Sequence, residues 1–144
     1  YLNRHKPLSE FKDNIHLNGL QERVEAHPVA LWSAVGTHTL FMTDHGATQS
    51  FFREHFEQYQ LPCAGQCCVP CTTLRAIFDS VPLQRCDLLK LDCEGAEYQI
   101  LYQTPPEVLS RVRSIALECH RIPGESVEQL DEYGAEAQIR PAMY

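Results

Sequence analysis

The stretch that most constrains the fold runs from Cys86 to Glu97 and reads Cys-Asp-Leu-Leu-Lys-Leu-Asp-Cys-Glu-Gly-Ala-Glu. A short, mainly apolar run within it ends on the acid Asp92 and passes directly into a glycine-containing, acidic helix start. This order is typical of an open α/β sheet, in which ligands bind just outside the carboxyl ends of the parallel strands. The stretch therefore predicts a buried strand at about 87–92, a helix at about 95–103 and a site between them.

Three acids follow this strand, namely Asp92, Glu94 and Glu97, and they have two interpretations. Carboxylates at a strand end can orient a substrate hydroxyl, accept its proton or hold a cation. Acids in the first turn of a helix also complement its dipole, at about 0.3–1 kcal/mol each, without any role in a site. Lys90 shares a strand face with Asp92. Because a lysine in a buried strand needs a partner, an internal ion pair with Asp92 explains the presence of Lys90 at least as well as a role in catalysis does.

A second strand is predicted at about 112–119, and it ends at Glu118 and His120. If the two strands are parallel neighbours joined by a right-handed crossover, both carboxyl ends face the same crevice. Asp92, Glu94, Glu118 and His120 would then converge, and histidine is the natural general base near neutral pH. The alternative is a solvated strand end, where polar residues are common.

Helix and strand patterns alternate along the rest of the chain. The segment 51–60 has no clean period and is either a short helix or a loop covering the site. The other predicted elements are a helix from Pro7 to a stop at Asn18-Gly19, an edge or bulged strand Arg23–Trp32 containing Pro28, a strand 39–42, a helix capped by Thr72 and ended by Pro82, a capping box at Thr104–Glu107 with a helix to Ser110, and a weak helix around Val127, Leu130 and Ile139.

Four cysteines, at positions 63, 67, 68 and 71, cluster just before the helix that Thr72 is predicted to cap. The spacing of Cys68 and Cys71 suggests either a zinc site or a redox pair. A structural zinc site normally needs four ligands in paired knuckles, and the other pair, Cys63 and Cys67, is irregular. The residues before Cys68 are not the hydrophobic strand that a thioredoxin-like motif follows. Incidental thiols are therefore the favoured interpretation.

Composition excludes some function classes. With 144 residues the chain is long enough for one modest domain. A net charge of −7 with only 12 scattered basic residues argues against a nucleic-acid partner. No apolar stretch is long enough for a membrane span and no signal peptide is evident, which favours a cytoplasmic protein and no membrane partner. The oligomeric state is not indicated.

The block Asp87–Tyr98, together with Ile100-Leu101 and the run Ile115–His120, resembles the signature of FkbM-type methyltransferases. Segments 14–20, 29–32 and 69–74 resemble other parts of that family, so that the match covers about residues 8 to 120 in order. The family is known for S-adenosylmethionine-dependent enzymes with a Rossmann-like fold that often O-methylate sugars or natural products.

This resemblance implies an α/β fold, namely a Rossmann-like methyltransferase sheet with flanking helices, and a small-molecule or glycan hydroxyl as methyl acceptor. It places Asp92, Glu94, Glu118 and His120 in the catalytic site. It places Ala30 and Trp32 where the family strand approaches the adenine of the cofactor. No residue is assigned to a metal site, and the sequence does not indicate whether a metal is needed.

The cofactor half of the family fold is not evident in this chain. A Rossmann-like methyltransferase holds its cofactor with a glycine-rich turn after the first strand and an acid ending the second, and no Gly-x-Gly-like turn occurs here. Residues 1–7 align with the family just after the second strand. We therefore expect residues 1–144 to form a single partial domain that lacks the first two strands and the last strands of the sheet.

Such a partial domain should not bind S-adenosylmethionine by itself. In the family's sheet the strands near 24–31 and near 87–92 are separated by the first two strands. If those two are absent, either the edges of the remaining strands are exposed or the sheet closes across the missing strands. Two functions remain: a methyltransferase present as a fragment that is inactive alone, or a non-catalytic remnant or interaction module on the same scaffold. A glycine-rich turn in frame upstream of Tyr1 would favour the enzyme.

Overall fold

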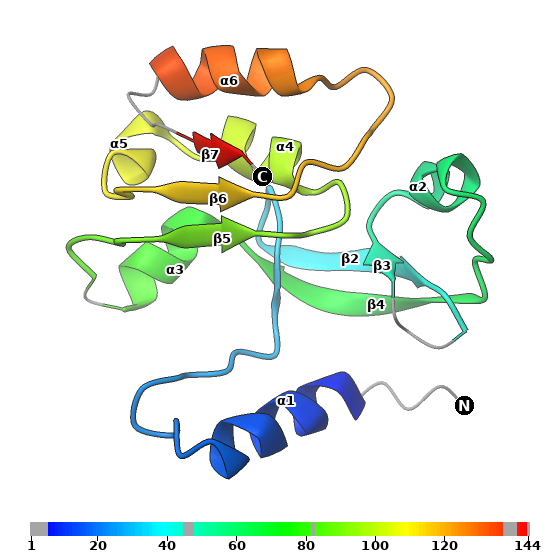
Figure 1. Cartoon of the computed structure of the whole chain (residues 1–144), viewed down its shortest axis with the longest axis horizontal. Helices are drawn as coiled ribbons and strands as arrows, with labels where there is room; N and C mark the ends of the chain where they lie inside the picture. Colours follow the sequence, from blue (N-terminus) through cyan, green and yellow to red (C-terminus); the bar gives the residue numbers. More distant parts are fainter. Residues whose placement is uncertain (1–5, 45–47, 82, 137–140, 144) are drawn as a thin grey trace.

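The computed structural model describes residues 6–44, 48–81, 83–136 and 141–143, which form a mixed α/β structure (Figure 1). Its elements, in chain order, are α1 (Lys6–Leu17), β1 (Ala30–Leu31), β2 (Gly36–Met42), β3 (Gln49–Ser50), α2 (Arg53–Gln58), β4 (Gly65–Thr72), α3 (Leu74–Ser80), β5 (Leu89–Leu91), α4 (Glu97–Gln103), α5 (Pro106–Leu109), β6 (Ile115–Leu117), α6 (Val127–Glu136) and β7 (Pro141–Met143). None of the helices in these ranges is long and apolar enough to cross a membrane.

The two strands that end in the predicted site residues are parallel neighbours. Strand β5 pairs with β6 in the register Leu89↔Ile115 to Leu91↔Leu117, and the crossover between them contains α4 and α5. The prediction of adjacent parallel strands is confirmed, with shorter strands than expected. Strand β7 adds to the other edge of β6, also in parallel. The chain thus contains a strand after β6, contrary to the expectation that the last strands are absent. Its three residues are too few to show the alternating pattern by which a strand is recognised in a sequence.

A second sheet has the strand order β1-β4-β2-β3. Strands β2 and β4 are antiparallel from Gly36↔Cys71 to Met42↔Gly65, and β1 lies parallel to β4 at one edge. The edge position explains how Pro28 is tolerated just before β1. The predicted strand Arg23–Trp32 is too long, because only Ala30 and Leu31 find a partner strand.

The two sheets are not joined by strand pairing in the ranges that the structure describes, and β1 and β5 belong to different sheets. Among the described residues, no strand pairs with the outer edge of β5, and the adjacent Leu88 is 63% exposed. In Figure 1 the arrowheads of β5 and β6 point toward the side where β3 and α2 lie, so that the second sheet faces the carboxyl ends of the first.

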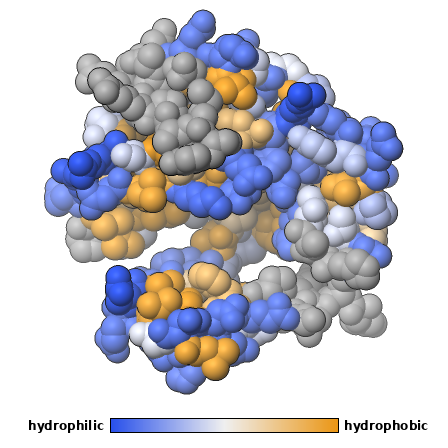
Figure 2. All heavy atoms as spheres, viewed as in Figure 1, coloured by the Kyte–Doolittle hydropathy of each residue, from blue (hydrophilic) through white to orange (hydrophobic). Residues whose placement is uncertain are grey.

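The hydrophobic core lies between the parallel sheet and the helices of its crossover. Ala96 and Leu109 are fully buried, and Leu31 and Trp32 pack against this core from the second sheet. Helix α1 contributes little: Ile15 is buried, but Phe11 of the same predicted stripe is 50% exposed. Figure 2 shows the lobe that contains α1 separated by a gap from the rest of the molecule.

Several local predictions are corrected by side-chain hydrogen bonds. Thr73, not Thr72, caps α3, since its Oγ1 accepts from the backbone N–H of Ala76 at 3.1 Å. The Thr104 hydroxyl donates to the carbonyl of Ile100 at 2.6 Å instead of capping α5. Asn18-Gly19 does end α1, with Gly19 at a φ of 64°. The predicted helix around Val127 is present as α6, while Pro82 and Ile139 lie outside the described residues.

Leu109→Ala should destabilise the chain by about 2–5 kcal/mol, because Leu109 is fully buried and its truncation leaves a cavity. Leu88→Ala is the matched control, because Leu88 is 63% exposed and its loss should change stability by less than about 0.5 kcal/mol. Urea denaturation followed by circular dichroism measures both. Equal losses for the two variants would contradict this placement of the core.

Candidate active site

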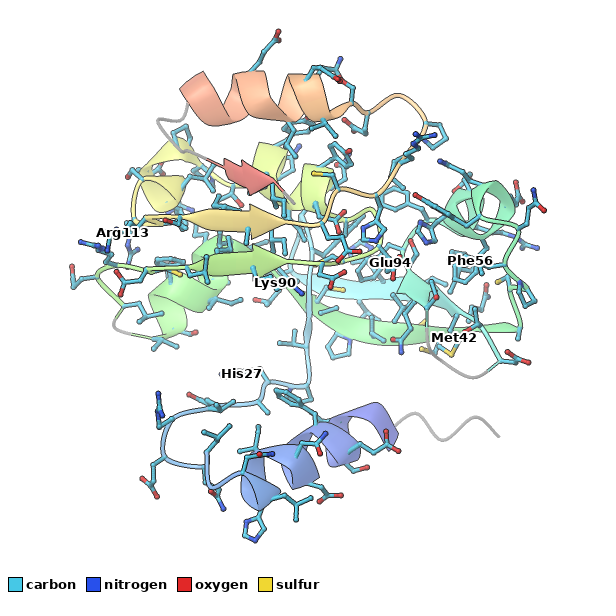
Figure 3. All side chains as sticks on the ribbon, viewed as in Figure 1. His27, Met42, Phe56, Lys90, Glu94 and Arg113 are labelled. Atoms are coloured by element: carbon cyan, nitrogen blue, oxygen red, sulfur yellow. The ribbon has the colours of Figure 1, made fainter. Side chains whose placement is uncertain are left out.

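The four predicted catalytic side chains converge at the carboxyl ends of β5 and β6. The Nε2 atom of His120 lies 3.2 Å from Oε2 of Glu94 and 4.0 Å from Oε1 of Glu118. One donor atom each of Asp92, Glu118 and His120 lies within 4.8 Å of the others. Figure 3 shows Glu94 between these strand ends and α2, with Arg113 at the opposite end of the sheet. The predicted convergence is confirmed; the catalytic roles stay predictions.

The carboxylate of Glu97 is the anchor of this site. It is fully buried at the start of α4, where Oε1 accepts from the backbone N–H of Cys93 at 2.6 Å and Oε2 accepts from that of Gly95 at 2.9 Å. Its Oε1 also faces Nδ1 of His120 at 3.1 Å. Glu97 therefore closes the turn between β5 and α4 and orients the imidazole of His120. The sequence pointed to this acid but did not decide whether it only stabilises the helix start or belongs to the site.

The turn that carries Glu94 has an unusual backbone. Glu94 has a φ of 51° and Gly95 a φ of 103°, both in the left-handed region. A Cβ atom on Gly95 would lie 2.3 Å from Cδ1 of Ile122, so that the Ile122 side chain would have to move for any other residue, and the φ value itself favours glycine. The buried Ser50 of β3 donates its hydroxyl to the carbonyl of Glu94 at 2.6 Å, which ties the second sheet to the turn.

His55 is the site residue that sequence reasoning missed. The undecided segment 51–60 contains the short helix α2, and its His55 is only 2% exposed, with Nε2 3.0 Å from Oε2 of Glu94. The His55 ring also lies 4.7 Å from that of Tyr59 and 5.7 Å from that of His120, between ring centroids. Burial lowers the pKa of His55, which favours its neutral form. No periodicity marks this histidine, so that only the tertiary contact identifies it.

Both ring nitrogens of His120 face a carboxylate oxygen, Glu97 at Nδ1 and Glu94 at Nε2. A neutral imidazole has one N–H donor, whereas the imidazolium has two. If both glutamates are ionised, only the imidazolium turns both contacts into hydrogen bonds. The two glutamates thus fix the orientation of the His120 ring from both sides.

Asp92 and Glu118 form the outer, solvated rim of the site. The Asp92 carboxylate pairs with the ammonium of Lys90 at 3.1 Å. The predicted ion pair is confirmed, but the buried environment expected for Lys90 is wrong, because its side chain is 66% exposed on an uncovered face of β5. The rim donors and His120 could accommodate a divalent cation. Lys90 balances the charge of Asp92, which weakens the attraction of this rim for a cation. The assignment of no metal ligand stays a prediction.

The predicted cofactor residues lie on the second sheet. Trp32 follows β1 and packs against Phe51 at 4.5 Å between ring centroids, while Ala30 is half-buried at the sheet edge. Trp32 also borders a cavity of about 140 Å³. This cavity is lined by Trp32, Ser33, Thr73, Arg75, Ile100, Gln103, Thr104 and Pro105. It is smaller than the roughly 300–1,000 Å³ of typical small-molecule sites, so that it could hold only part of a nucleoside-sized ligand.

The cysteine cluster is not a cluster in space. Residues 65–72 form β4, a strand that was not predicted from the sequence. Because side chains alternate along a strand, Cys68 and Cys71 point to opposite faces, the first exposed and the second buried. They cannot bind one metal ion or form a redox pair together. Burial raises the pKa of the Cys71 thiol and that of Cys93, the latter to about 11, as expected of inert thiols.

Gly95→Ala should destabilise the chain more than Gly124→Ala does. Both glycines have a positive φ, but a Cβ on Gly95 would clash with Ile122 whereas one on Gly124 would meet no atom within 4 Å. The control should therefore lose only the conformational term of about 1 kcal/mol, and Gly95→Ala more than that. Thermal unfolding of both variants measures the difference. Equal losses would show that Ile122 does not press on the turn.

A family model described as the Methyltransferase FkbM domain matches residues 3–138 of the chain. Comparisons with curated proteins and with solved structures found no match.

Proposed function

Because this chain belongs to the FkbM methyltransferase family, we propose that it supplies the acceptor side of a site that methylates a hydroxyl of a sugar or natural product. The observation that carries this proposal is the contact between the buried Glu97 carboxylate and Nδ1 of His120 at 3.1 Å. A histidine whose Nδ1 is held by a buried carboxylate presents Nε2 in a fixed direction, which is the arrangement of an oriented general base.

The chemistry on the acceptor side follows from this geometry. An acceptor hydroxyl that enters between His120 and the rim takes the place of Glu94 Oε2, which lies 3.2 Å from Nε2 of His120. Nε2, freed of its proton, then accepts the hydroxyl proton, which makes the acceptor oxygen a stronger nucleophile. The imidazolium that results is stabilised by Glu97 and loses its proton to water at the open rim. Family members usually take the methyl group from S-adenosylmethionine, whose sulfonium supplies an electrophilic methyl.

The charge of the site favours a neutral acceptor. Asp92, Glu94 and Glu118 bring three carboxylates to one rim, while Lys90 is the cation paired with it. An acceptor with a phosphate or carboxylate near its reacting hydroxyl would be repelled there. Sugar hydroxyls can instead donate hydrogen bonds to these oxygens. A neutral polyol or glycan is therefore the acceptor class that we propose.

The described residues do not fit the methyl donor as well as they fit an acceptor. The cavity beside Trp32 is about 140 Å³, too small for a whole S-adenosylmethionine. We therefore derive no step through the donor and keep the proposal that the chain alone does not bind it. The same mismatch supports the second candidate function, a non-catalytic interaction module on the methyltransferase scaffold. So does the edge of β5, with which no strand of the described ranges pairs.

Isothermal titration of the 144-residue chain with S-adenosylmethionine should show no binding at micromolar concentration, because the sequence has no Gly-x-Gly-like turn to hold the cofactor and the cavity beside Trp32 is small. S-adenosylhomocysteine, titrated in parallel, should behave in the same way. Micromolar binding of either compound would overturn the proposal that the donor side is incomplete.

His120→Gln should lower turnover by about 10²-fold or more, because it removes the proposed proton acceptor. The assay follows transfer of a labelled methyl group to a panel of neutral sugars, using the protein encoded by the complete reading frame. Asp87→Asn is the control, since Asp87 lies before β5 and pairs with Arg85 at the surface. Unchanged turnover in His120→Gln would remove His120 from the mechanism; if Asp92→Asn alone is unchanged, Asp92 is only a rim residue.

A further inference from the structure

The tyrosine at the end of α2 is an exposed aromatic residue beside the site, and it takes no part in the proton transfer proposed for His120. Tyr59 is 44% exposed, and its hydroxyl accepts from the backbone N–H of Arg121 at 3.3 Å. Tyr59 and His55 are four residues apart and share a face of α2. Their ring centroids lie 4.7 Å apart, and Nε2 of His55 lies 3.0 Å from Oε2 of Glu94. Tyr59 therefore extends the site outward from Glu94.

The position of Tyr59 is fixed by the backbone as well as by these contacts. Helix α2 ends in a Schellman motif, in which the N–H of Leu61 donates to the carbonyl of Phe56 at 2.8 Å. The N–H of Gln60 donates to the carbonyl of Glu57 at 3.2 Å, and Gln60 has the left-handed conformation of this motif, with a φ of 53°. Because the backbone and the hydroxyl of Tyr59 are both held, this side chain has little freedom left to lose when a ligand binds.

A fixed aromatic ring beside a rim of carboxylates matches a ligand with an apolar face and a hydroxyl-bearing edge. Apolar surface that a ligand removes from water contributes about 25 cal/mol per Å² to binding. The carboxylates of Asp92, Glu94 and Glu118 accept hydrogen bonds from hydroxyls. A pyranose ring has both features, since its C–H groups form the faces and its hydroxyls project from the edge. An acyclic polyol has no such face, and a simple phenol has few hydroxyls for three carboxylates.

We propose that Tyr59 is the platform on which the acceptor stacks, and that the acceptor is therefore a pyranoside. This inference rests on the proposed function, in which a hydroxyl of a neutral sugar enters between His120 and the rim. A C–H face of the sugar ring lies on Tyr59, while hydroxyls along the edge of the ring donate to the carboxylates of the rim. Tyr59 thus selects a cyclic acceptor and contributes to binding, and it moves no proton.

Three substitutions of Tyr59 separate stacking from the other roles of this side chain. Tyr59→Ala removes the ring, and Tyr59→Leu keeps apolar surface but removes the flat aromatic face. Tyr59→Phe keeps the ring and loses only the hydroxyl contact to Arg121. Phe11→Ala is the matched control, because Phe11 is also an exposed aromatic residue, at 50%, but lies in the separate lobe that contains α1 (Figure 2).

Saturation-transfer difference NMR of the 144-residue chain measures binding of the methyl pyranosides of glucose, galactose, mannose, xylose, rhamnose and fucose. At least one of them should bind, with the strongest saturation on its ring C–H protons. Tyr59→Ala should raise its dissociation constant about tenfold, and Tyr59→Leu about fivefold. Tyr59→Phe and Phe11→Ala should change it by less than about twofold. D-sorbitol, which has hydroxyls but no ring, and catechol, which has an aromatic face but two hydroxyls, should bind more weakly.

Three results would overturn the proposal: no pyranoside binds at millimolar concentration, sorbitol or catechol binds more tightly than every pyranoside, or folded Tyr59→Ala binds as tightly as the wild type. If near-ultraviolet circular dichroism shows that Tyr59→Ala does not fold, Tyr59→Leu decides by the same criterion. These titrations contain no methyl donor. Pyranoside binding without turnover in the complete protein would therefore contradict the proposed function alone, whereas turnover that Tyr59→Ala leaves unchanged would contradict only the platform.

Discussion

The buried carboxylate of Glu97 is the interaction on which the site depends. A buried charge is costly unless hydrogen bonds satisfy it, and Glu97 receives backbone N–H groups from Cys93 and Gly95 as well as the ring of His120. These contacts join the end of β5, the start of α4 and the segment after β6. Removing the carboxylate would leave two backbone N–H groups of the turn and the ring of His120 without this acceptor at once, so that Glu97 stabilises the left-handed backbone of the turn.

The site also holds the two sheets together. Strand pairing does not connect them in the described ranges, but Ser50 of β3 donates to the carbonyl of Glu94, and His55 of α2 binds the Glu94 side chain. Both contacts join the second sheet to the same residue of the turn. Polar groups that could serve chemistry therefore also serve assembly, and Glu94 is central to both. Substitutions there will need structural controls before an effect on activity is assigned to chemistry.

The two sides of the proposed reaction are unequally represented. The acceptor side has an oriented imidazole, a carboxylate in the position that a hydroxyl would take and an acidic rim. The donor side offers Trp32 beside a small cavity that does not enclose a nucleoside-sized ligand. The family suggests methyltransferase activity in general, while the geometry supports the proposal of a role on the acceptor side. Whether the chain acts as an enzyme or as an interaction module therefore depends on binding of the methyl donor and not on the acidic residues of the rim.

The sequence by itself determined the parallel pair β5–β6, the helix between them and the convergence of Asp92, Glu94, Glu118 and His120. It could do so because a short apolar run followed by an acid and a helix start is a local pattern, and because crossover chirality then places both strand ends in one crevice. Only the tertiary structure decided the role of His55, the opposite faces of Cys68 and Cys71, and the exposed position of Lys90. Each of these depends on a partner distant in the chain, or on the strand assignment of a segment without a local period. Contacts of that kind leave no periodic signal in the sequence.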